Sequence, residues 1–156
     1  MQLPARFDID ECQAFFVLFA RFEYAMKVAG IRQPSKSGSV EADWGKLAED
    51  VGSELFSSSD AKLKQACCYI LKHPPKRQDL DGEHLVWSNV PADQGNDARD
   101  LFIYVRRVRN NLFHGGKFRG RNLADPERAA ILITAVSTIL SSVLEMRPQL
   151  CEAFNG

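Results

Sequence analysis

The sequence lacks the features of several common protein classes. Its 20 Lys and Arg residues balance 20 Asp and Glu residues, so no net charge attracts nucleic acid or a membrane to the whole surface. The longest uncharged run, residues 129–144, is shorter than the ~20 residues of a membrane span and contains Ser and Thr. The first residues carry acids where a secretion signal has bases. We therefore expect a cytoplasmic protein without a membrane segment, in which residues 129–144 form a buried helix.

Signatures of metal, phosphate-loop and serine-hydrolase chemistry are also missing. The four cysteines form no C-x-x-C pair, and neither His73 nor His84 is placed to complete a zinc site with them. No G-x-S-x-G or phosphate-loop pattern occurs. We expect reduced thiols, no metal and no cofactor.

What the sequence does contain is helical periodicity in a chain of 156 residues, the size of one domain. In residues 7–30 the apolar Phe15, Phe19, Phe22 and Met26 recur at helical spacing. Capping residues and stop signals delimit further helices over residues 44–56, 60–71, 97–114 and 126–146. No credible run of strands is present. We predict an all-α fold, a four- to five-helix bundle in a single domain over residues 1–156.

Residues 73–96 interrupt this helical pattern. Pro74 and Pro75 end the preceding helix, and the segment that follows has no helical period. We predict an irregular insertion here, with a short extended piece near residues 84–87.

A cluster of basic residues lies near the end of the helix over residues 97–114. No acid occurs between Tyr104 and Asn122, and this stretch holds six bases: Arg106, Arg107, Arg109, Lys117, Arg119 and Arg121. Cations near a helix C-terminus also satisfy its last carbonyls, which explains one or two of them. Six favour an anion-binding surface suited to phosphates, although such patches also serve protein partners.

Within this cluster, Arg109, Asn110 and His114 have the side chains that phosphodiester chemistry needs. Arginine binds phosphate oxygens in a planar fork, and neutral histidine accepts or returns a proton near physiological pH. Asn110 lies four residues before His114, on the same side of the helix. Arg109 lies five residues before it, about 140° around a straight helix. Arg109 and His114 therefore meet only at a distorted helix end or across a dimer interface. The alternative to a catalytic role is that His114 is a helix cap.

The segment "RNNLFH", with a helix before and after it, resembles the R-x4-6-H motif of the HEPN superfamily. In that motif a polar residue follows the Arg, as Asn110 does here. The resemblance implies a dimeric helical bundle, and for many members a metal-independent endoribonuclease of toxin–antitoxin, phage-defence or RNA-processing systems. It also implies that His114 is the general base or acid, that Arg109 holds the scissile phosphate and that Asn110 orients one of them. Gly116 stands where one toxin subset has a modified Tyr, so that form of control is not expected.

Other residues are candidates for supporting roles. Glu23 lies on the apolar side of the first helix, where a buried carboxylate needs a partner. Either Arg109 or Arg106 reaches it, or it pairs with Lys27 at the next turn. Arg106 and Arg107 are expected to follow the RNA backbone, with Lys117, Arg119 and Arg121 as a second row, and solvated surface is the alternative for each.

The sequence thus predicts a homodimeric endoribonuclease that acts on RNA by 2′-hydroxyl attack. A non-catalytic HEPN module that binds RNA, a nucleotide or a protein partner is the alternative. A third possibility is a structural subunit, with the helix over residues 129–144 left partly uncovered. An antitoxin or another regulatory protein is a possible further partner.

Overall fold

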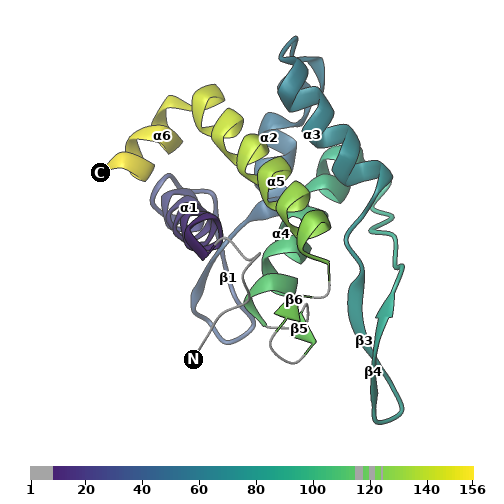
Figure 1. Ribbon diagram of the computed structural model, residues 1–156. Coiled ribbons are helices and arrows are strands. Elements are labelled where there is room, and N and C mark those ends of the chain that lie inside the picture. Colours follow the sequence, from purple (N-terminus) through teal and green to yellow (C-terminus); the bar gives the residue numbers. More distant parts are fainter. Residues whose placement is uncertain (1–8, 115–117, 120–121, 124) are drawn as a thin grey trace.

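The computed structural model describes residues 9–114, 118–119, 122–123 and 125–156, and most of these residues are helical (Figure 1). The predicted predominance of helix is therefore confirmed. The helices of the described residues are α1 (Ile9–Val28), α2 (Trp44–Ser57), α3 (Ala61–Lys72), α4 (Asp97–Phe113), α5 (Pro126–Met146) and α6 (Pro148–Asn155).

Capping side chains begin four of these helices, at or next to the positions that the sequence predicts. Asp43 accepts a hydrogen bond from the backbone of Lys46, and Asp60 accepts from Lys62 and Leu63. Asn96 and Asp125 cap α4 and α5 in the same way, by accepting from residues three positions later. Because each cap satisfies backbone N–H groups that the helix leaves free, these boundaries are set locally.

The core forms where helices α1 to α5 bring their apolar faces together. Phe15, Phe19, Phe22 and Met26 of α1 are almost completely buried, as their spacing predicts. Trp44, the first residue of α2, lies among aromatic rings of α1 and α4, with its ring centroid 5.5 to 5.7 Å from those of Phe19, Phe22 and Phe102. Such contacts fix the angle at which these helices meet.

Helix α5 is long and apolar enough to cross a membrane by length and composition, but half of that window is buried inside the protein. Val136, Ile139, Leu140 and Val143 have no exposed surface. The helix packs mainly on α3 and also contacts α1 and α6. Its apolar face is therefore covered within one chain, as expected for a core helix.

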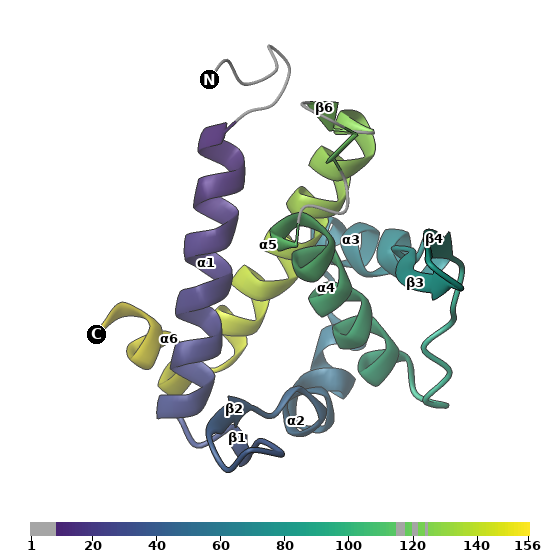
Figure 2. The same ribbon diagram turned by 90° about the horizontal axis from the view of Figure 1, so that it is seen from below.

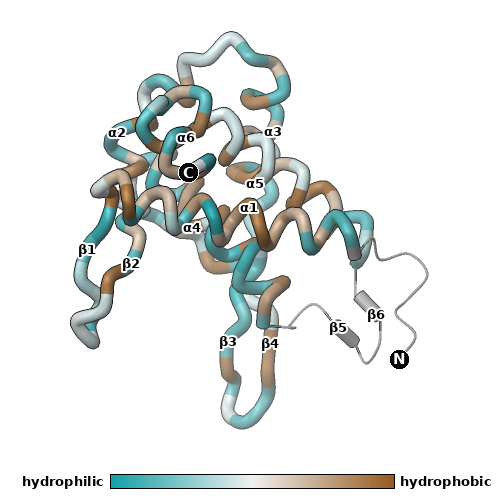
Figure 3. The backbone as a smooth tube through the Cα atoms, turned by 90° about the vertical axis from the view of Figure 1, so that its left-hand side faces the viewer, coloured by the Kyte–Doolittle hydropathy of each residue, from teal (hydrophilic) through white to brown (hydrophobic). Residues whose placement is uncertain are grey.

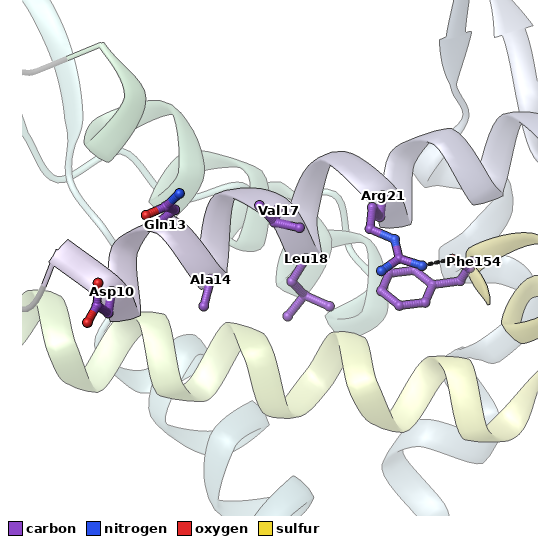
Figure 4. A pocket seen from close by; sticks show the side chains of 7 residues that line it. All are labelled: Asp10, Gln13, Ala14, Val17, Leu18, Arg21 and Phe154. Atoms are coloured by element: carbon purple, nitrogen blue, oxygen red, sulfur yellow. Dashed lines mark hydrogen bonds between the residues drawn. The ribbon is translucent and has the colours of Figure 1, made fainter. Parts of the chain in front are cut away.

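Helix α6 was not predicted, because Pro148 was interpreted only as the end of α5. Proline is also favoured at the first position of a helix, where its missing N–H costs nothing. The helix packs on α1. There Arg21 donates a 2.5 Å hydrogen bond to the carbonyl oxygen of Phe154 and lies over its ring, at the edge of a shallow hollow (Figure 4).

Residues 73–96 correct the prediction of an irregular insertion, because they contain a regular hairpin. Strand β3 (Arg77–Asp81) pairs antiparallel with β4 (His84–Ser88). Gly82 has a φ of +61° in the two-residue turn between them, a backbone conformation that favours glycine. The extended piece predicted near residues 84–87 is confirmed as β4, whereas β3 was missed. Neither strand has a buried residue, and five residues are too few to give a strong alternating pattern. The hairpin extends away from the helices (Figures 1 and 3).

Two further antiparallel pairs are very short. Strands β1 (Arg32–Pro34) and β2 (Val40–Ala42) close the loop after α1, and β5 (Phe118–Arg119) pairs with β6 (Asn122–Leu123) before α5. The sequence predicts no run of strands, and these two short pairs were not expected. Tight turns make such pairs locally, without a sheet in the core.

Candidate nucleic-acid interface

Helix α4 carries the predicted motif and lies between α1 on one side and the β3–β4 hairpin on the other (Figure 2). Its apolar residues at helical spacing are buried: Leu101, Tyr104, Val105, Val108 and Leu112. The polar residues of the motif therefore project from its two flanks. Arg109 projects to one of them and His114 to the other.

Arg109 faces α1. Its Nη2 donates to the Oε1 of Glu23 at 3.3 Å, and its guanidinium lies 5.1 Å from the centroid of the Phe19 ring. The two charged side chains are about a quarter exposed, 26% for Arg109 and 28% for Glu23. Of the alternatives for Glu23, the structure has the pair with Arg109.

Trp44 extends this contact. Its indole Nε1 donates to the same Oε1 of Glu23 at 3.2 Å. One carboxylate oxygen therefore accepts from both the indole and the guanidinium. Because Trp44 is fixed in the core, Glu23 is held in place and orients Arg109 in turn.

The Nε–H of Arg109 is buried and has no acceptor among the described residues. A buried donor without a partner costs roughly 1–3 kcal/mol. A buried group of this kind calls for an explanation, such as an ordered water, a bound ion or a catalytic role.

On the opposite flank, α4 and the hairpin enclose a groove of about 410 Å³. We call it the hairpin groove. It contains Asn110 and His114 together with Arg106, as their positions on one helical side predict. Its complete lining is Arg77, Gln78, Ile103, Arg106, Arg107, Asn110, Asn111 and His114.

Arg109 is not part of that lining, so one chain does not bring Arg109 and His114 together. Helix α4 stays helical through Phe113, and the backbone N–H of His114 bonds to the carbonyl of Asn110 at 3.0 Å. His114 is the C-cap residue of α4, with φ −88° and ψ 13°, outside the helical range. Up to Phe113 the helix is continuous, so no helix distortion within these described residues brings the two side chains together.

Arg107 has a structural contact as well as a place in the groove. Its Nη1 donates to the carbonyls of Pro75 at 3.1 Å and Val90 at 2.8 Å, the two ends of the hairpin segment. Burial lowers the pKa of Arg107, which nevertheless stays charged. Arg107 therefore fixes the hairpin and contributes its charge to the groove wall. Arg106 is exposed.

The second predicted row of bases lies mostly outside the described residues. Lys117 and Arg121 are not among them, and Arg119 is described only as part of β5. Their proposed contact with RNA stays a prediction.

Phe113 forms an exposed apolar bridge between the two flanks. Its side chain is 64% exposed. Its ring meets Phe16 of α1 edge to face at 5.2 Å and lies 6.0 Å from the ring of His114. Val17, Tyr24 and Val28 of α1 are exposed as well.

Sequence reasoning missed four residues of the groove: Arg77, Gln78, Ile103 and Asn111. The signal for the first two was Gly82 between two short extended segments, because glycine at the first position of a two-residue turn is typical of a hairpin. This signal predicts the hairpin but does not predict its contact with α4.

In comparisons with known proteins, no family model, no curated protein and no solved structure matches the chain.

Proposed function

We propose that the protein is a metal-independent endoribonuclease of HEPN type that acts as a homodimer. The observation that carries the proposal is the hairpin groove, where His114 and Asn110 stand among three arginines. A basic groove with an exposed imidazole suits binding of a phosphodiester and transfer of a proton.

In this mechanism the neutral imidazole of His114 accepts the proton of an RNA 2′-hydroxyl. The 2′-oxygen then forms a bond to phosphorus while the bond from phosphorus to the 5′-oxygen breaks. The leaving oxygen takes up a proton, and the products are a 2′,3′-cyclic phosphate and a 5′-hydroxyl. Charge that develops on the phosphate oxygens is stabilised by a guanidinium.

Arg109 supplies that guanidinium from a second copy of the chain. Within one chain it faces α1 and His114 faces the groove, so a two-fold axis near Phe113 is what would unite them. The exposed apolar ring of Phe113 supports an interface on this side of the molecule. Asn110 would orient His114 or the phosphate from within the groove.

The resemblance also suggests a cellular setting. A toxin or phage-defence effector in the cytoplasm, restrained by an antitoxin or another regulatory protein, is the setting that we infer. Arg106, Arg107, Lys117, Arg119 and Arg121 would hold the RNA backbone there.

Binding without chemistry is the second candidate. The separation of Arg109 from His114 favours it, since the groove by itself has the charge and amides to hold RNA, a nucleotide or an acidic protein segment. In that case substitution of His114 leaves binding unchanged.

The test is cleavage of mixed RNA in EDTA by wild-type protein, His114→Ala and His84→Ala, each checked for folding and dimerisation. His84 is an exposed histidine at the hairpin turn and serves as the matched control. We expect cyclic phosphate ends from wild type and His84→Ala only. Equal cleavage by all three would contradict the proposal, and salt-sensitive binding without cleavage would favour the binding module.

A further inference from the structure

The β3–β4 hairpin is held against α4 at its base by three side chains of that helix. Arg107 binds the carbonyls of Pro75 and Val90, and the Nδ2 of Asn111 donates to the carbonyl of Lys76 at 2.8 Å. The hydroxyl of Tyr104 accepts from the backbone N–H of Ala92 at 2.9 Å. The first hairpin residues after this base, Arg77 and Gln78, are therefore fixed beside the motif helix.

The hairpin groove is strongly cationic. Arg77, Arg106 and Arg107 contribute three guanidinium groups, and no carboxylate is among the described residues that line it. Asp79 lies next to the groove, and its Oδ1 accepts from the Nε of Arg77 at 2.7 Å. Hydrogen bonds from Arg77 and Ser88 lower the pKa of Asp79, so this carboxylate is charged and competes for Arg77.

The rest of the lining suits a base and a sugar. Gln78, Asn110 and Asn111 place three amides in the groove, and Ile103 is its apolar member. Amides present both donors and acceptors, the groups that read the edges of an unpaired base. A volume of about 410 Å³ holds a ligand of the size of one nucleotide.

From this combination we propose that the hairpin groove is a nucleotide subsite, which binds the nucleotide next to the cleaved phosphate. Arg77 contacts its phosphate and Gln78 contacts its base. This inference rests on the proposed function, because His114 shares the groove and would act on the adjacent bond. The hairpin would then determine which nucleotide is bound next to the cleaved phosphate, whereas His114 carries out the cleavage.

Arg77 and Asp79 give a test in which two substitutions break one ion pair with opposite expected effects. Arg77→Gln removes a phosphate ligand, whereas Asp79→Asn removes the competing carboxylate and frees Arg77. If the pair only stabilises the hairpin, both substitutions act in the same direction. If Arg77 binds phosphate, they act in opposite directions.

The probe is a fluorescent single-stranded 12-mer RNA with 2′-O-methyl groups, which the proposed mechanism cannot cleave. We expect Arg77→Gln to weaken binding about tenfold, as for one lost hydrogen bond between charged groups. The slope of log affinity against log salt should become shallower by about 0.7, the value for one phosphate contact on a single strand. Asp79→Asn should bind more tightly, and Lys64→Gln, on the exposed face of α3, should bind like wild type.

Cleavage sites on a long RNA form the second measurement. Gln78→Leu should change the preferred nucleotide while it keeps the cyclic phosphate ends, because it removes an amide and leaves His114 intact. Unchanged affinity and sites in both Arg77→Gln and Gln78→Leu, with wild-type cleavage present, would overturn the subsite alone. Absence of RNA binding and cleavage by the wild type would overturn the proposed function and the subsite with it. Tight binding of an acidic peptide in place of RNA would do the same.

Discussion

Glu23 controls the motif arginine through a single oxygen atom. That atom accepts from Arg109 at 3.3 Å and from the indole of Trp44 at 3.2 Å. The indole is buried among aromatic rings, so its hydrogen bond restricts the position of Glu23. Glu23 in turn restricts the position of the partly exposed guanidinium. In the mechanism that we propose, Glu23 positions Arg109 without contacting RNA.

Two substitutions at Glu23 separate its charge from its hydrogen bonds. Gln keeps an acceptor for Trp44, so we expect Glu23→Gln to fold with a loss of about 1 kcal/mol or less and to lower kcat by releasing Arg109. Ala removes both bonds and should lower the free energy of unfolding by about 1–3 kcal/mol. Urea unfolding and single-turnover cleavage measure the two effects.

Trp44→Phe provides a comparison for this pair, since it removes the indole donor and leaves the ion pair of Glu23 with Arg109; the smaller buried ring also lowers stability. An Arg109 that acts independently of Glu23 would show unchanged kcat in Glu23→Gln, and that result would remove the positioning role.

At the scale of elements, α2 and α4 approach each other at a point where one of them has no side chain. A Cβ on Gly52 of α2 would lie 2.8 Å from the Cβ of Ala98 in α4, closer than real side chains pack. The contact determines how near α2 comes to the motif helix. This distance between the helices matters for the site because Trp44 is the first residue of α2 and donates a hydrogen bond to Glu23.

We therefore expect Gly52→Val to be strongly destabilising. The added methyl groups force the helices apart, and overpacking of this kind costs typically about 1–3 kcal/mol. Thermal or urea unfolding measures the loss. Gly45→Ala in the same helix is the matched control, because its Cβ would meet only Asp43 Oδ1 at an ordinary 3.4 Å, and it should not destabilise.

A wild-type unfolding midpoint for Gly52→Val would mean that α2 moves freely relative to α4. The account of Trp44 as a fixed support for Glu23 would then be wrong.

At the scale of the whole molecule, the arrangement of α4 between α1 and the hairpin places Arg109 and His114 on different flanks. In one copy, Arg109 faces α1 and His114 faces the hairpin groove. A dimer is the economical way to unite them, since a two-fold axis generates two equivalent combinations.

Mixing two inactive variants tests this directly. Co-refolded Arg109→Ala and His114→Ala chains form heterodimers in which one of the two sites has an intact Arg109 from one copy and an intact His114 from the other. With random assembly we expect roughly a quarter of wild-type activity, since half the dimers are mixed and each has one complete site. Cleavage of RNA by the mixture and by each variant alone is the measurement.

The control mixture combines His114→Ala with the double variant Arg109→Ala/His114→Ala, which leaves no complete site in any pairing. A mixture as inactive as this control, from chains shown to form dimers, would place both residues in one protomer.

Most helix boundaries of this protein are determined by the sequence alone. Asp43, Asp60, Asn96 and Asp125 cap the helices they precede, and two prolines end α3. These signals act within one turn of chain, so no distant partner is needed to interpret them. The buried faces of α1, α3 and α4 follow equally from apolar residues at helical spacing. The sequence also places Asn110 and His114 on one side of α4 for the same reason.

Only the tertiary structure decided what each flank of α4 faces. Glu23 is 86 residues from Arg109 in sequence, and Arg107 lies 32 residues from Pro75. The pairing of Glu23 with Arg109, and the entry of Arg77 and Gln78 into the groove, depend on how α1 and the hairpin pack on α4. Periodicity tells which residues share a face, but it carries no information about the segment that covers that face. The reason is physical: helix caps and faces are local, whereas the neighbours of a surface are set by the packing of the whole chain.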